Sequence, residues 1–174
     1  MLVDQSGADR DMVLTEEFWY VDPNSRRWQA PFGARINGAS IPRPLWSMVG
    51  SPYTDDYRRA SIVHDVACIN VEVNRKDADV MFYNACLAGG CPTFQAMLLY
   101  AGVCLGRWSS VVFPSRAFSK EKLLFRVPFQ PSLDEQFLQN KFLVIASELM
   151  TQFEGASEVS YVELDVVISK HINL

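Results

Sequence analysis

The sequence predicts an α+β fold: an N-terminal β-hairpin, a central three-helix core, then C-terminal strands with one long amphipathic helix. Strand-type residues flank a turn near the N-terminus, three helical stretches follow, and the last third mixes β-branched runs with an amphipathic stretch. We divide the chain into residues 1–108, the hairpin and helical core, and residues 109–174, an α/β extension expected to pack on the same domain.

The hairpin is predicted by residues 12–22 and 28–36, which are rich in β-branched and aromatic side chains and flank a turn at Pro23-Asn24-Ser25. The run SIPRPLWSMVGS, residues 40–51, follows it and contains two prolines and a glycine. We expect no regular helix there, only a connection to the helical part.

Three helices are predicted in close succession. Residues 55 to about 71 begin with acidic residues and continue without proline or glycine. Asn74 precedes Asp77 by three positions, the pattern of an N-cap with a reciprocal carboxylate, and predicts a second helix to about residue 87. A Gly-Gly-Cys-Pro break separates it from a third, apolar helix that we expect to end near Gly106.

The last third is predicted to contain two strands and a helix. Residues 123–129, LLFRVPF, are mostly apolar, and residues 159–169, VSYVELDVVIS, are rich in β-branched side chains, so both look like strands, whereas residues 133–153 have helical periodicity. We expect this long helix and its flanking strands to serve a protein partner or self-association.

The composition excludes some classes of partner. A formal net charge of −4 and a pI near 5.2 argue against binding to nucleic acid, which requires clustered Lys and Arg. The first residues lack the basic start and apolar run of a signal peptide, and no stretch approaches the ~20 apolar residues of a transmembrane helix. We therefore expect a protein made in the cytoplasm, unless a dedicated secretion machine or a lysing phage exports it.

The four cysteines are Cys68, Cys86, Cys91 and Cys104, and their spacings of 18, 5 and 13 positions match no zinc-binding motif. We interpret them as mostly buried thiols. A disulfide from Cys86 or Cys91 is the alternative in an oxidising compartment.

A polar cluster is predicted on the first two helices. His64 and Asp65 lie on a helix that is apolar or small around most of its circumference, so both should enter the interior. Asp79 lies past the first turn of the next helix, which a short connection makes antiparallel to the first. We expect these three residues to meet. The structural alternative is that His64 binds a core carbonyl, Asp65 pairs with an arginine and Asp79 is exposed.

Several phrases of the chain resemble a phage and bacterial family called domain of unknown function 1353. They occur in the family's order and at its separations: Ala39-Ser40-Ile41-Pro42-Arg43, Trp46, His64-Asp65, Arg75, Ala78-Asp79 and Phe82. The resemblance covers residues 12 to 108. Asn37-Gly38 stands where the family tends to have Asp-Phe, and Cys68 stands where it tends to have Tyr.

A second pattern is similar to the phospholipases A2, and it consists of Asn37-Gly38-Ala39-Ser40, His64-Asp65, Asp79 and Phe82. This resemblance implies hydrolysis of a phospholipid or other ester, with His64 as general base and Asp79 orienting its ring. It also implies that Asp65 and the backbone around Asn37 and Gly38 hold Ca²⁺, which would polarise the ester carbonyl. The supporting residues expected around this site are Ser40, Arg43, Trp46, Arg75 and Cys68.

Other functions stay open. A His-Asp metal site of the phosphohydrolase type needs more imidazoles, and the other histidine is the distant His171. A non-catalytic phage or secretion-system accessory protein would use the polar cluster only to fix helix register. An effector would combine the hydrolase with a C-terminal region for delivery or recognition.

Overall fold

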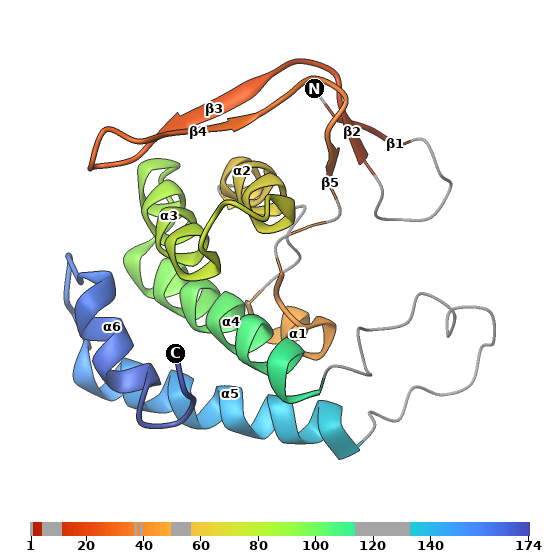
Figure 1. The fold of residues 1–174 in the computed structure, drawn as a ribbon. Coiled ribbons are helices and arrows are strands. Elements are labelled where there is room, and N and C mark those ends of the chain that lie inside the picture. The colour runs from red at the N-terminus through yellow and green to blue at the C-terminus, as the bar shows by residue number, and fades with distance from the viewer. Residues whose placement is uncertain (1, 5–11, 37, 39, 50–56, 114–132) are drawn as a thin grey trace.

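The computed structural model describes residues 2–4, 12–36, 38, 40–49, 57–113 and 133–174 (Figure 1). In these residues the strands lie at one edge of the molecule and the helices form the rest. The α+β class is therefore confirmed. Among the described helices, none combines the length and the apolar character that a membrane span requires.

Short antiparallel strands form two small sheets at the N-terminal end. One sheet has the order β1-β2-β5 and the other pairs β3 with β4. The strands are β1 (Leu2–Asp4), β2 (Met12–Leu14), β3 (Phe18–Val21), β4 (Arg27–Ala30) and β5 (Arg35–Ile36).

The predicted hairpin is confirmed between β3 and β4, where Phe18 pairs with Ala30 and Val21 with Arg27. Asp22 builds the turn, because its Oδ1 accepts hydrogen bonds of 2.9 Å from the backbone N–H groups of residues 24 and 26. Its Oδ2 accepts a third, also 2.9 Å long, from the Trp28 indole. This side chain therefore fixes both the turn and the inward-facing Trp28.

The connection after the hairpin is more regular than the prolines suggest. A 3-10 turn, η1 (Arg43–Leu45), leads directly into a one-turn helix, α1 (Trp46–Val49). The expectation of no regular helix is thus wrong for these residues, because proline is tolerated in a first helical turn, where its missing N–H is not needed. Residues 50–51 of the predicted connection lie outside the described residues.

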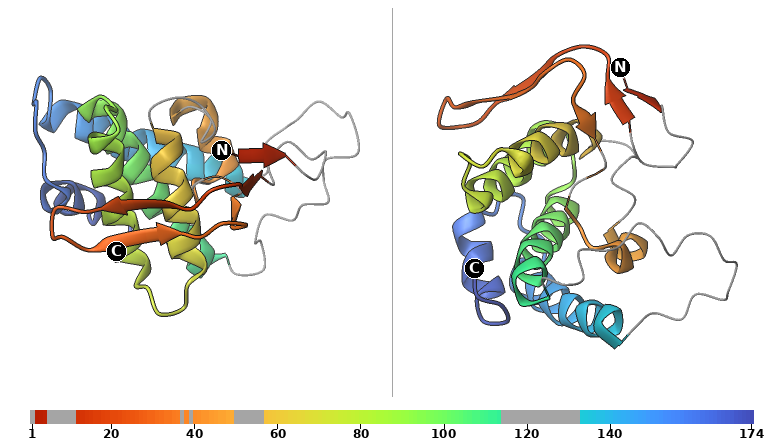
Figure 2. Two further views of the ribbon diagram at one scale, coloured as in Figure 1. Left: turned by 90° about the horizontal axis from the view of Figure 1, so that it is seen from above. Right: turned by 45° about the vertical axis from the view of Figure 1, so that its right-hand side comes forward.

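The three core helices follow as predicted: α2 (Arg58–Ile69), α3 (Arg75–Ala88) and α4 (Thr93–Val112). Asn74 is confirmed as the N-cap of α3, since its side chain accepts the Lys76 N–H at 2.8 Å. The α3 helix packs on α2 and on α4, and the β3–β4 hairpin lies across α2 (Figure 2, left). The buried aromatic side chains of α3 and α4, Phe82, Tyr83 and Tyr100, lie in this core.

The C-terminal part is helical. Here α5 (Leu133–Gln152) packs against α4 and η1, and α6 (Tyr161–Ile168) packs against α5 and α4 (Figures 1 and 2). The strand predicted at residues 159–169 is wrong, because Ser160 and Glu163 form a capping box that starts a helix there. The strand predicted at residues 123–129 lies outside the described residues.

The α4 helix continues past its predicted end and runs very close to the segment around Ser40. A Cβ atom at Gly106 would lie 1.9 Å from the Ser40 carbonyl oxygen, so only glycine fits there. One turn earlier, a Cβ at Gly102 would lie 3.3 Å from Ile41. Both glycines allow the close approach of α4, and Gly106 does not end the helix as the sequence pattern suggested.

A buried His-Asp-Arg cluster between three helices

The structure brings His64 and Asp79 together as predicted. His64 lies in the middle of α2 and Asp79 in the second turn of α3, and both side chains have no exposed surface. The two helices pack side by side, and the His64 Nε2–H donates a 2.9 Å hydrogen bond to Asp79 Oδ1. The Phe82 ring, one turn further along α3, lies 4.9 Å from the imidazole between centroids.

Arg107 is a third member of the cluster that the sequence pattern did not identify. Its Nε–H donates a 2.8 Å hydrogen bond to Asp79 Oδ2, and its side chain is 17% exposed. Arg107 belongs to α4, one residue beyond the expected helix end at Gly106. A helix continued through that glycine would have placed Arg107 one turn after Val103 and Cys104, on a buried face.

The acidic neighbour determines the protonation of His64. Complete burial lowers the pKa of an imidazole, but the hydrogen bonds with Asp79 and Cys68, together with the negative charge of Asp79, raise the pKa of His64 to about 10. The pKa of Arg107 is also raised: burial lowers it, but the hydrogen bond with Asp79 and the Asp79 charge outweigh that effect. The cluster at neutral pH is therefore an aspartate between two cations.

Cys68 contacts the same imidazole from one helical turn away. Its Sγ lies 3.5 Å from Nε2 and 3.7 Å from Nδ1 of His64. Positions i and i+4 of a helix share a face, which explains the contact. All four cysteines are free thiols, and Cys68 is half-buried while the other three are buried.

Asp65 anchors the segment after the β-hairpin. The Gly38 N–H donates a 2.8 Å hydrogen bond to Asp65 Oδ2, and both residues are buried. Gly38 has φ +92°, a conformation that favours glycine. The structure thus joins two of the predicted metal ligands, but through a donated N–H rather than through oxygen atoms facing one point. Asn37, the third, lies outside the described residues.

No group of three or more His, Cys, Asp or Glu side chains among the described residues is arranged to hold a metal ion. Asp65 supplies an oxygen of the kind that Ca²⁺ prefers, and the Gly38 N–H occupies one position beside it. Calcium therefore stays a prediction.

The predicted supporting residues have different surroundings in the structure. Ser40 is half-buried, and its carbonyl oxygen lies against Gly106 of α4. Arg43 begins η1. Trp46 begins α1 and donates a 3.0 Å hydrogen bond from its indole to the Ile41 carbonyl, so it packs on the core. Arg75 begins α3 and donates a 3.4 Å hydrogen bond to the Cys68 carbonyl at the end of α2.

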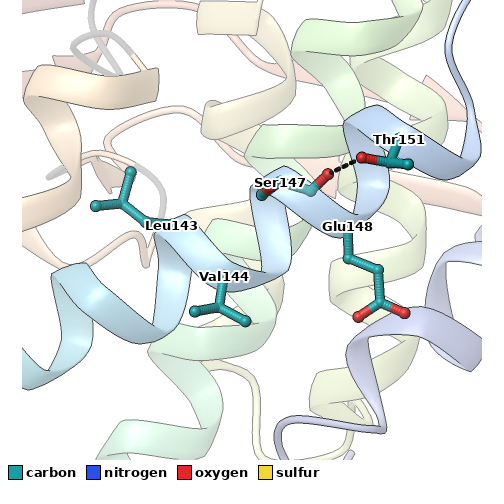
Figure 3. Close-up of a pocket in the computed structure, with 5 residues that line it drawn as sticks. All are labelled: Leu143, Val144, Ser147, Glu148 and Thr151. Carbon is teal, nitrogen blue, oxygen red and sulfur yellow. Dashed lines mark hydrogen bonds between the residues drawn. The ribbon is translucent and has the colours of Figure 1, made fainter.

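Other polar features lie away from the cluster. His171 Nε2 lies 2.7 Å from Glu148 Oε2, and Lys170 also pairs with Glu148, so this histidine fastens the C-terminus to α5. A shallow hollow on α5 is lined by Leu143, Val144, Ser147, Glu148 and Thr151 (Figure 3). All five side chains belong to one helix, and the Thr151 hydroxyl donates a 3.0 Å hydrogen bond to the Ser147 carbonyl of that helix.

Comparisons with known proteins identify the family. "Uncharacterized protein y4jT" of Sinorhizobium fredii (strain NBRC 101917 / NGR234) is 37% identical over 90 residues, which are 52% of this chain and 27% of that protein. "Uncharacterized protein y4iH" of the same strain is 39% identical over 113 residues, 64% of this chain and 47% of that protein. The chain thus spans about a quarter and about half of these two relatives.

No solved structure matches the chain. Neither of the two relatives carries the name of a phospholipase A2. Residues 12–103, which include the hairpin, His64, Asp65 and Asp79, match the sequence profile described as "Protein of unknown function (DUF1353)". The chain therefore belongs to the DUF1353 family.

Proposed function

We propose that this chain is a non-catalytic accessory module in which the His64–Asp79–Arg107 cluster holds three helices in register. The observation that carries the proposal is the shared carboxylate. Asp79 of α3 accepts from His64 of α2 through one oxygen and from Arg107 of α4 through the other. Each core helix thus contributes one charged group, and buried ionic groups of this kind can specify a single packing arrangement.

The burial and charge of His64 support this role. A general base must meet water, whereas the His64 side chain has no exposed surface. A base must also be unprotonated, and the raised pKa of His64, about 10, keeps the ring charged at neutral pH. A charged His64 is well suited to an ion pair and poorly suited to removing a proton.

The lengths of the relatives support a module that works within larger proteins. The chain spans 27% and 47% of the two relatives, so in both of them the DUF1353-like segment accompanies other sequence. A segment that recurs in proteins of different length suits a folding unit with its own core. In this proposal the cluster provides the stable helical frame.

A hydrolase is the second candidate, and the geometry of the His64–Asp79 bond favours it. Asp79 holds Nε2, which leaves Nδ1 as the nitrogen that would take a proton from water. For this chemistry the ring has to become accessible and lose its proton. For Ca²⁺ this candidate relies on the Asp65 carboxylate, whose Oδ2 accepts the Gly38 N–H in the structure.

One assay separates the two candidates. Vesicles of mixed phosphatidylcholine and phosphatidylglycerol are incubated with the protein at pH 7 and pH 10, with calcium or with EDTA, and released fatty acid is measured. We compare wild type, His64→Gln and the control Asp77→Asn, whose carboxylate on α3 is 56% exposed. The accessory role predicts no release above buffer in any arm. Release by wild type and Asp77→Asn that a folded His64→Gln variant lacks would establish the hydrolase instead.

A further inference from the structure

The outer side of α5 carries no charge. A surface helix ordinarily presents charged and polar residues to the solvent. In α5, which has 20 residues, every exposed residue is uncharged and the charged ones are all half-buried, although the chain as a whole is 21% charged. We call this side of the helix the outer stripe. Its members are Gln136, Phe137, Asn140, Leu143, Val144, Ser147, Met150 and Thr151.

The outer stripe has the spacing of a surface that packs on another helix. Its members recur every three or four residues, which is the period of helix-to-helix seams. The inner side of α5 already packs on α4 and η1, so the helix has two apolar sides. The shallow hollow of Figure 3 lies on the outer one. The large apolar members of the outer stripe, between 45% and 54% exposed, are Phe137, Leu143, Val144 and Met150.

The outer stripe has nearly the same chemistry when it is read from either end. Two aliphatic residues stand at its centre. Three residues outward on each side is an uncharged polar residue, and three residues further is a large apolar one. A two-fold symmetric contact needs this kind of pattern, because residue i of one copy meets residue j of the other, and j meets i. The matched pairs are Leu143 with Val144, Asn140 with Ser147, and Phe137 with Met150.

The charges beside the outer stripe suit two antiparallel copies of α5. Lys141 and Glu148 are seven residues apart, so they border the stripe on the same side. In a pair centred between Leu143 and Val144, Lys141 of one copy comes within about 3 Å of the level of Glu148 of the second copy along the helix axis. The two Glu148 residues are about 13 Å apart along that axis. Opposite charges therefore lie closer together than like charges.

We propose that the chain forms a two-fold symmetric dimer in which the outer stripe of α5 packs antiparallel on the outer stripe of a second copy. The uncharged surface, its symmetric pattern and the complementary charges beside it favour a second copy over an unrelated partner, which requires no such symmetry. The stripe extends about 20 Å along the helix, so we expect a small interface with a dissociation constant in the micromolar range. This inference does not depend on the accessory role or on the hydrolase.

Sedimentation velocity of the whole chain, from about 1 to about 200 µM, measures the association. We expect the 19.7 kDa chain to form a species of twice that mass as its concentration rises. Leu143→Glu buries a carboxylate against Val144 of the second copy, and should raise the dissociation constant at least about a hundredfold. The matched control is Val162→Glu on α6, an equally exposed residue outside the stripe, which should associate like wild type.

Disulfide crosslinking tests the antiparallel arrangement. Chains carrying Asn140→Cys and chains carrying Ser147→Cys are mixed and mildly oxidised, and mass spectrometry identifies the linked peptides. The proposal predicts a link between position 140 of one chain and position 147 of the other. Two copies of the same position are about 10 Å apart along the axis, so each variant alone should link poorly.

Three results would overturn the proposal. One is a wild-type chain that stays monomeric at the highest concentration. Another is a folded Leu143→Glu variant that associates as tightly as Val162→Glu. The third is a crosslink that joins like positions, which would show parallel packing. If circular dichroism shows that Leu143→Glu does not fold, the wild-type mass and the linked positions decide the question.

Discussion

Arg107 binds the one oxygen of Asp79 that His64 leaves free, at 2.8 Å, and it reaches that oxygen from a different helix. The pair joins α3 to α4, while the His64 bond joins α3 to α2. Asp79 is completely buried, so its charge is stable there only because both partners are present. Removing any one of the three groups should therefore weaken the packing of all three helices.

Replacing Asp79 with Asn should destabilise the fold strongly. The change leaves His64 and Arg107 without their shared counter-charge in the interior, and we expect the free energy of unfolding to fall by about 3–5 kcal/mol. Urea denaturation followed by circular dichroism measures the loss. Asp77→Asn, also on α3, serves as the control: it removes only an exposed ion pair with Arg26 and a charge in the first helical turn, and should cost no more than about 1 kcal/mol. Equal losses in the two variants would contradict the structural role of the cluster.

Stability should fall as the solution becomes alkaline. The folded pKa of His64 is raised above its ordinary value of 6.5 to about 10, so its contribution is complete below pH 6.5 and is lost as pH approaches 10. Buried cysteines and tyrosines add their own losses above about pH 9. These losses are common to wild type and His64→Gln, so they cancel in the difference between the free energies of unfolding of the two proteins. This difference should shrink steadily from pH 7 to pH 10. A difference that stays constant over this range would show that the imidazole is not charged in the fold.

A glycine pair on α4 tests the close approach to the segment around Ser40. Gly106→Ala places a methyl group on a backbone carbonyl oxygen, so we expect a loss of about 2–3 kcal/mol or more. Gly102→Ala meets only the flexible Ile41 side chain, and the helix preference for alanine offsets the contact to within about 1 kcal/mol. Thermal unfolding of both variants gives the comparison. If Gly106→Ala unfolds at the same temperature as wild type, α4 does not approach the Ser40 carbonyl as closely as the structure shows.

Tyr83 should fasten the C-terminal part to the core. Its hydroxyl donates a buried 2.7 Å hydrogen bond to the Val159 carbonyl, just before α6. Tyr83→Phe leaves that carbonyl without its partner, and we expect a loss of about 1–3 kcal/mol with faster amide exchange in α6. Tyr161→Phe, at the half-buried start of α6, is the matched control. Unchanged exchange in Tyr83→Phe would contradict this role.

The hairpin, the three core helices and the His64–Asp79 contact were predictable from local patterns. The turn at Pro23-Asn24-Ser25 and the Asn74 cap act over a few residues, so they are visible in the sequence. The short connection between the two helices then placed Asp79 opposite His64.

The remaining features depend on contacts that sequence patterns do not display. Gly106 resembles a helix end, but glycine is required there because the Ser40 carbonyl, 66 residues earlier, lies against it. Ending the predicted helix at Gly106 left Arg107 outside it, so Arg107 was not recognised as a member of the cluster. The β-branched run 159–169 resembles a strand, although its Ser160 and Glu163 form a capping box that could have identified α6. The complete burial of His64 depends on three packed helices, and no local pattern indicates it.

The protonation state of His64 tests the central claim most directly. Nitrogen chemical shifts of the two histidine rings, recorded by NMR from pH 5 to pH 11, distinguish an imidazolium from a neutral ring, and a His171→Gln variant assigns the signals. We predict that both His64 nitrogens stay protonated through neutral pH and titrate near pH 10. A ring that is neutral at pH 7 and exchanges freely with water would contradict the ion-paired His64–Asp79–Arg107 cluster. It would support His64 as a general base instead.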